Sequence, residues 1–144
     1  MIDYARYAIP FVWLVPLLAA FVVRVVLHDT RLQRISAILA AWLVFLVCTA
    51  LFLENSWGDA ATAFAPDTLE SGPLFMALHF HMAVDGLNAV LLPMTSAIAL
   101  ALLLSIPRSD LRGDTAAHIL IVEGSLLANF LSLDLAMFAV FWVV

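Results

Sequence analysis

The stretch ISAILAAWLVFLVCTALFL, residues 35–53, decides the fold class of this 144-residue chain. It contains no charged residue, and a helix needs roughly 20 mainly apolar residues to cross the hydrocarbon core of a bilayer. The same bias extends over the whole chain, in which 65% of the residues are apolar, 12% are charged and the mean hydropathy is +1.10. A soluble domain is about 45–50% apolar and about 25% charged, so the composition excludes both a soluble globular domain and a disordered chain.

The charges exclude a nucleic-acid-binding protein, because eleven acidic residues stand against six arginines and no lysine, for a net charge of −5. The single cysteine, Cys48, lies within an apolar run, so it belongs to no disulfide framework. The sequence also has no glycine-rich phosphate loop, no cysteine cluster and no nucleophile elbow. We therefore expect no catalytic residue, no metal and no cofactor on this chain.

Further apolar runs predict further membrane spans. Three more runs of full length cover residues 7–27, 81–106 and 115–131. A fifth run begins after Asp134, and it gives only about 16 Å of helix, whereas the hydrocarbon core is about 30 Å thick. We predict an all-α integral membrane protein, a single unit over residues 1–144, with four full transmembrane helices and a truncated fifth. A helix that ends inside the bilayer implies either a longer protein or a partner chain that covers its end.

The arginines predict the orientation of these spans. Arg31 and Arg34 follow the first run, and Arg108 and Arg112 follow the third, whereas the connection over residues 54–73 is acidic and has no arginine. Short loops rich in arginine stay on the cytoplasmic side of a membrane. We therefore expect the N-terminus and the acidic connection to lie outside.

Glu123 is the most informative ionisable residue, because it lies at the middle of the run over residues 115–131. Ionisable groups inside a membrane are costly, and they are usually functional. Two interpretations remain open: a proton-exchanging carboxyl in a relay, or a protonated and hydrogen-bonded residue between packed helices. His118 and Asp85 are the other relay candidates.

Polar residues in the third and fourth runs also form stripes. His118 shares a helix face with Ser125 and Asn129, and Glu123 lies about 140° away from His118 on the same helix. In the third run, Asp85 shares a face with Asn88 and Ser96. Such residues either hydrogen-bond between helices or line a hydrated path. Polar contacts between helices are expected for His81, Asn88, Ser125, Asn129 and Asp134.

Two segments carry a resemblance to a known family. They are HMAVDGLNAVLLPMTSAIALALLLSI, residues 81–106, and HILIVEGSLLANFLSLDLAMFAVFW, residues 118–142. In their order and spacing they resemble the N-terminal part of the antiporter-like membrane subunits of proton-pumping NADH:quinone oxidoreductase, above all the subunit M type. The matching residues are His81, Asp85, Gly86, Phe130, Leu131, Asp134, Phe141 and Trp142.

The resemblance implies a membrane subunit of a larger proton- or ion-translocating complex in a bacterial inner membrane, with other membrane subunits as partners. Such a subunit is non-catalytic, and this chain is incomplete for proton translocation alone, because the family's central lysines lie on later helices. The family also carries a glutamate directly after its F-W pair, where this chain has Val143. That difference favours the alternative, a structural or assembly subunit of a hydrogenase, cation/proton antiporter or inorganic-carbon uptake complex that moves no ion. Glu123 and the polar stripes favour the ion path.

Overall fold

The structure, a computed structural model, describes residues 4–57, 67–71, 80–84, 86–107 and 113–143. The described helices are α1 (Tyr4–Phe21), α2 (Thr30–Trp57), α3 (Asn88–Ser105), α4 (Gly113–Leu131) and α5 (Leu135–Val143), and a π-helical turn, η1 (Val22–Val26), continues α1. The two described strands are β1 (Asp67–Ser71) and β2 (Phe80–Val84).

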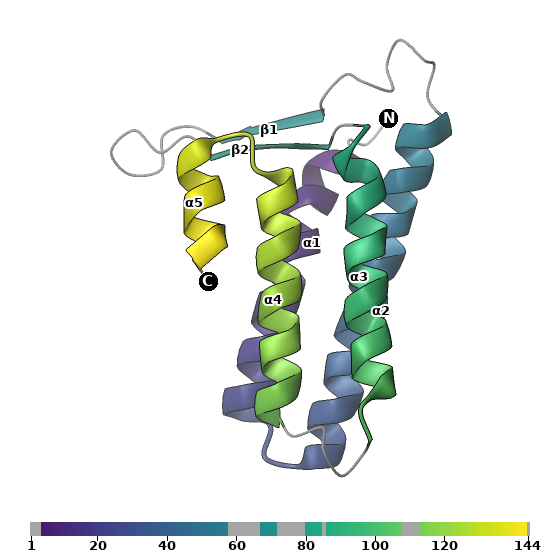
Figure 1. Ribbon diagram of the computed structural model, residues 1–144, viewed down its shortest axis with the longest axis vertical. Coiled ribbons are helices and arrows are strands. Elements are labelled where there is room, and N and C mark those ends of the chain that lie inside the picture. The colour runs from purple at the N-terminus through teal and green to yellow at the C-terminus, as the bar shows by residue number, and fades with distance from the viewer. Residues whose placement is uncertain (1–3, 58–66, 72–79, 85, 108–112, 144) are drawn as a thin grey trace.

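Helices α1 to α4 stand side by side as an up-and-down bundle (Figure 1). Each helix packs against its neighbours in the order α1, α2, α3, α4, and α4 closes the bundle against α1. The start of α2 lies at one end of the bundle, together with η1, the end of α3 and the start of α4, and the two strands lie across the opposite end (Figure 1). The shorter α5 packs against α4 and touches α1 through an edge-on contact between the rings of Phe141 and Trp13, whose centroids are 5.4 Å apart.

Three of the described helical segments are long and apolar enough to cross a membrane: Ala8–Val26, Thr30–Glu54 and Asn88–Ser105. Their outward faces are apolar as well, since Leu39 in α2 is 62% exposed and Ile98 in α3 is 59% exposed. A wide apolar exterior of this kind is what a lipid-embedded bundle requires and a soluble one avoids. Helix α4 is of similar length, with 19 residues, but it carries more polar side chains and is not one of these three segments.

The third apolar run begins differently from the sequence prediction. We expected a helix from His81, but residues 80–84 form β2, and α3 begins only at Asn88. Strand β2 pairs antiparallel with β1, with His81 opposite Glu70. Met82, Ala83 and Val84 are all buried. Since backbone pairing with β1 is available over these residues, they satisfy their hydrogen bonds as a strand, and the bundle end receives a small apolar cap.

The interior is divided into two apolar clusters. The cluster near the strands includes Leu92 of α3 and Leu127 of α4, and the cluster near the opposite end includes Leu100 and Leu120 of the same two helices. On α4, Glu123 falls between the two clusters. The bundle core is therefore interrupted by a polar residue about midway along its length.

Asn88 joins three elements at the strand end of the bundle. Its buried side-chain Nδ2 donates to the carbonyl oxygen of Ala83 in β2 at 2.9 Å and to that of Phe130 in α4 at 3.0 Å. One amide therefore fastens the start of α3 to the end of the strand and to the end of α4.

We expect Asn88→Ala to lower the free energy of unfolding by about 1–3 kcal/mol, because it takes a hydrogen-bond donor away from two carbonyl oxygens near the core. Equilibrium unfolding in mixed detergent micelles measures this loss. Ser105→Ala is the matched control, since the exposed Ser105 hydroxyl donates only to Ala101 of its own helix. Equal stability of the two variants would show that the Asn88 amide does not hold this end together.

Candidate functional site

The site centres on the carboxyl group of Glu123, in the middle of α4. The residue is only 2% exposed, and neither carboxyl oxygen has a hydrogen-bond partner among the described residues. Buried polar side chains are nearly always hydrogen-bonded, because a carboxyl removed from water without a partner costs several kcal/mol. A carboxyl that is buried and unpartnered is therefore an exception that calls for a functional explanation.

Gly124 sets the direction of Glu123. A Cβ atom added at Gly124 would lie 2.9 Å from Leu17 Cγ and 3.0 Å from the backbone oxygen of Trp13, so α1 and α4 nearly touch there. Small residues permit such close approach between membrane helices. Because the Gly124 face of α4 is held against α1, the adjacent Glu123 is turned about 100° away from that contact, onto the side that faces α3.

On that side, a groove of about 360 Å³ lies between α3 and α4. Its nine lining residues are Thr95, Ile98, Ala99 and Leu102 of α3, and His118, Ile119, Val122, Glu123 and Leu126 of α4. The groove opens on the outside of the bundle, since Ile98 and Val122 on its two walls are 59% and 55% exposed. Its surface is almost wholly apolar. Its polar lining residues are Thr95, His118 and Glu123, and the Glu123 carboxyl oxygens themselves have almost no exposed area.

The inner side of Glu123 faces the bundle core. The buried Cys48 thiol of α2 lies near the Ser96 hydroxyl of α3 and the Glu123 carboxyl of α4. The Ser96 hydroxyl itself donates to the Leu92 carbonyl oxygen of its own helix at 3.1 Å. Three helices thus meet at the level of Glu123, and neither of these neighbours hydrogen-bonds to its carboxyl oxygens.

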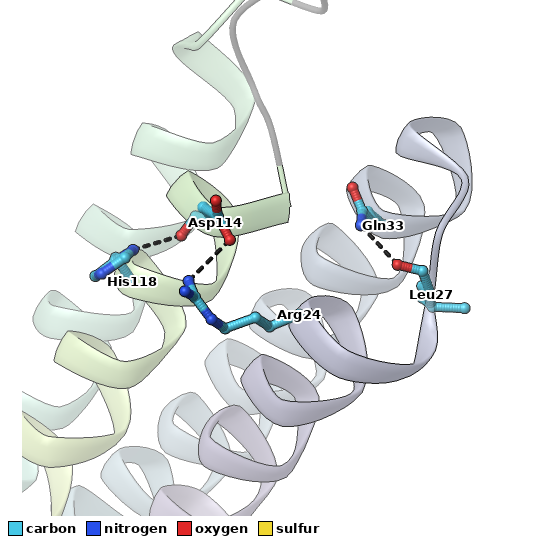
Figure 2. A network of polar contacts seen from close by, with 5 residues as sticks. All are labelled: Arg24, Leu27, Gln33, Asp114 and His118. Carbon is cyan, nitrogen blue, oxygen red and sulfur yellow. Dashed lines mark hydrogen bonds and ion pairs between the residues drawn. The ribbon is translucent and has the colours of Figure 1, made fainter.

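His118 lies at one end of the same groove, in a separate polar network (Figure 2). Its Nδ1 is 2.6 Å from the backbone oxygen of Asp114, whose Oδ1 accepts a hydrogen bond from Arg24 Nη1 at 2.8 Å. This ion pair is exposed and joins η1 to the start of α4. In the same view, Gln33 Nε2 donates to the Leu27 carbonyl oxygen and closes the turn between η1 and α2.

The wheel separation of Glu123 and His118 does not place them on different surfaces of the bundle. Five helical residues span about 7.5 Å along the axis and about 140° around it. A groove that spans a wide face of α4 can be lined by both residues. Here Glu123 and His118 lie at opposite edges of the α4 wall. The pair is therefore brought to one groove, although neither side chain bonds to the other.

The remaining predicted positions lie apart from this groove. The Ser125 hydroxyl donates to Ile121 within α4 at 2.8 Å, and Asp134 Oδ1 accepts from the Ala136 amide at 2.9 Å, which caps α5. Asn129 is buried, and its Oδ1 has no partner among the described residues. Asp85 lies outside the described residues, and so does the side chain of His81.

Sequence reasoning missed three parts of the site: the close contact at Gly124, the groove wall from Thr95 to Leu102, and the neighbouring Cys48. The only signal for the first was a glycine directly after Glu123 on an apolar helix. The groove wall carries no sequence signal, because Thr95 and Ala99 look like ordinary residues of an apolar span.

Comparison with known proteins adds no family to these observations: no protein-family model matches the chain, and no curated protein matches its sequence. The resemblance to antiporter-like subunits therefore rests on the quoted residues alone. It stays a prediction.

Proposed function

We propose that this chain is an integral membrane subunit of a multi-subunit complex that moves protons or other ions, and that Glu123 is its ion-exchanging group. The observation that carries the proposal is the Glu123 carboxyl, which is buried midway along an apolar bundle without a hydrogen-bond partner in the described residues. Ionisable residues at such a depth in membrane proteins mark ion pathways and proton relays.

The proposal includes α4 as a fourth spanning helix. Its 19 residues give about 28 Å of helix, close to the thickness of about 30 Å that a bilayer core requires. Three of its polar side chains, Glu123, Ser125 and Asn129, are buried inside the bundle rather than presented to lipid. This placement supports membrane insertion, because polar side chains are tolerated in a span when protein covers them.

The alternative function is that of a structural subunit that moves no ion. The observation that favours it is Val143, which stands where the resembled family has a glutamate. That residue is 85% exposed at the end of α5 and lies on another helix than Glu123. A proton relay through this chain would therefore combine Glu123 with ionisable groups of other subunits. A structural subunit would transfer no proton through Glu123.

The first test of the proposal is the state of the chain in its native membrane. We expect a tagged chain to migrate on a native gel in an assembly far larger than its own 15.7 kDa. Removal of the chain should abolish acidification of inverted membrane vesicles by that assembly, and reintroduction should restore it. Migration of the chain alone, or acidification that is independent of it, would contradict the proposed function.

The proposed orientation has the N-terminus outside. Arg24, Arg31 and Arg34 lie at the end of the bundle away from the strands, where Arg34 Nη1 donates to the Ile106 carbonyl oxygen at 3.3 Å. At the other end, β1 carries Asp67 and Glu70. Among the arginines of the described segments, only Arg6, on the first turn of α1, lies at the strand end. The excess of arginine at the opposite end, with Arg24, Arg31 and Arg34, favours the cytoplasmic side for that end.

Reporter fusions test this orientation. A cytoplasm-active reporter joined after Arg34 or after Arg112 should be active, and one joined after Glu70 should be inactive. A periplasm-active reporter should give the opposite pattern at all three positions. An external signal at Arg34 or at Arg112 would overturn the four-span topology.

A further inference from the structure

We propose that the groove between α3 and α4 receives an apolar transmembrane helix of a partner subunit, and that this helix presents an arginine or lysine side chain to Glu123. The inference rests on the proposed function, since it requires a multi-subunit membrane complex. It adds to that function the place where the partner binds and the chemistry by which the partner is recognised.

The walls of the groove fit a helix rather than a polar ligand. Ile98 and Leu102 of α3 face Val122 and Leu126 of α4 across it. The smaller Ala99 and Thr95 also belong to the α3 wall. Small residues flanked by larger apolar ones let a neighbouring helix approach closely and pack along its length, which is the usual arrangement between membrane helices.

Charge complementarity identifies the partner group. Both Glu123 oxygens lack a hydrogen-bond donor among the described residues, although the residue is 98% buried (2% exposed) and lines the groove. Among the described arginines, Arg24 pairs with Asp114, Arg34 donates to the Ile106 carbonyl oxygen, and Arg31 is exposed at the start of α2. The sequence contains no lysine.

A basic side chain supplies the hydrogen-bond donors and the compensating charge that the Glu123 carboxyl lacks, whereas a neutral side chain supplies only donors. An arginine fork donates to both oxygens of one carboxylate at once, and a lysine offers three donors and a compensating charge. Within a bilayer, basic and acidic groups on separate helices stabilise each other, because each alone would be desolvated without a partner. His118, which also lines the groove, has its Nδ1 directed to the backbone oxygen of Asp114.

Probe helices in a membrane test this recognition with the full chain. The chain, fused to a donor fluorophore, is co-expressed with one of three single-span probes that carry an acceptor: leucine-rich helices with arginine, glutamine or leucine at the centre. Energy transfer in isolated membranes measures association. We expect the arginine probe to associate roughly tenfold more strongly than the leucine probe, the scale of one strong interhelical polar contact, with the glutamine probe between them.

Variants of the chain assign that preference to the groove. Glu123→Gln should remove the preference for arginine and leave weak association with all three probes. Val122→Trp, on the α4 wall, should reduce association by filling the groove, whereas Leu39→Trp, at the exposed outer face of α2, should leave it unchanged. Labelling of Cys48, the sole cysteine and a buried one, reports whether each variant keeps the bundle closed.

Two results would overturn the proposal. One is equal association of all three probes with the unaltered chain, a result that does not depend on the folding of any variant. The other is a preference for the arginine probe that persists in Glu123→Gln. Either result would leave the proposed function standing if the native gel still shows the chain in a large assembly. Conversely, a chain that migrates alone in its native membrane overturns the proposed function, whatever the probes show.

Discussion

Gly124→Leu is expected to separate α1 from α4 and to abolish the closed bundle. A Cβ atom added at this position would lie 2.9 Å from Leu17 Cγ and 3.0 Å from the backbone oxygen of Trp13. The Leu17 side chain can rotate, but the Trp13 oxygen moves only if the whole of α1 moves. Adding a methylene to a tightly packed core costs about 1–3 kcal/mol. We expect that cost for Gly124→Ala, and a larger one for leucine.

The labelling rate of Cys48 by a membrane-permeant maleimide measures this effect. Cys48 is fully buried in the core cluster that α1 and α4 also form. Its thiol is therefore protected from labelling when the helices are packed and becomes reactive when they separate. Gly113→Ala is the comparison variant, because the nearest atoms to a Cβ there belong to the far end of the flexible Gln33 side chain rather than to backbone, so the expected change is a local one at the turn before α2. Protection of Cys48 in Gly124→Leu equal to that in the unaltered chain would show that α1 and α4 are not in close contact.

Much of the helical architecture could be predicted from the sequence, because each long helix overlaps a mainly apolar run. The run over residues 35–53 lies inside α2, and the run over residues 115–131 lies inside α4. Membrane helices satisfy their backbone hydrogen bonds within one segment, so local composition nearly decides them. The number of spans is less direct, since three segments qualify by length and apolarity and α4 is more polar.

The strands could not be predicted in the same way. Their pairing joins Thr68 to Ala83 and Glu70 to His81, residues that are distant in sequence and that carry no alternating pattern of apolar residues. A hydrogen-bonded ladder depends on which two segments meet, and that depends on how the helices before and after them are placed. The expected helix start at His81 was wrong for this reason.

The groove also lay beyond the sequence. The sequence gives the angular position of Glu123 relative to other residues of α4. Whether that position faces lipid, the core or a neighbouring helix depends on how α4 is rotated about its own axis in the bundle. That rotation is set by the contact of Gly124 with Trp13 and Leu17 on α1. Sequence patterns record spacing within a helix, and the site here depends on contact between two helices.

Glu123→Gln should stop ion movement without dissolving the complex. Glutamine keeps the shape of glutamate and retains a carbonyl acceptor, but its amide neither takes up nor releases a proton at physiological pH. The apolar walls of the groove on α3 and α4 are unchanged by this substitution, so the packing surface for the proposed partner helix is retained. Glu54→Gln is the matched control, since Glu54 is exposed near the end of α2, outside the groove.

The deciding measurement is acidification of inverted vesicles by the native assembly carrying Glu123→Gln, with the amount of assembly fixed by native gel. We expect normal assembly, normal acidification with Glu54→Gln, and acidification with Glu123→Gln reduced to the level of membranes that lack the chain. Normal assembly together with normal acidification in Glu123→Gln would contradict the ion-exchanging role and would make Glu123 a packing residue of a structural subunit.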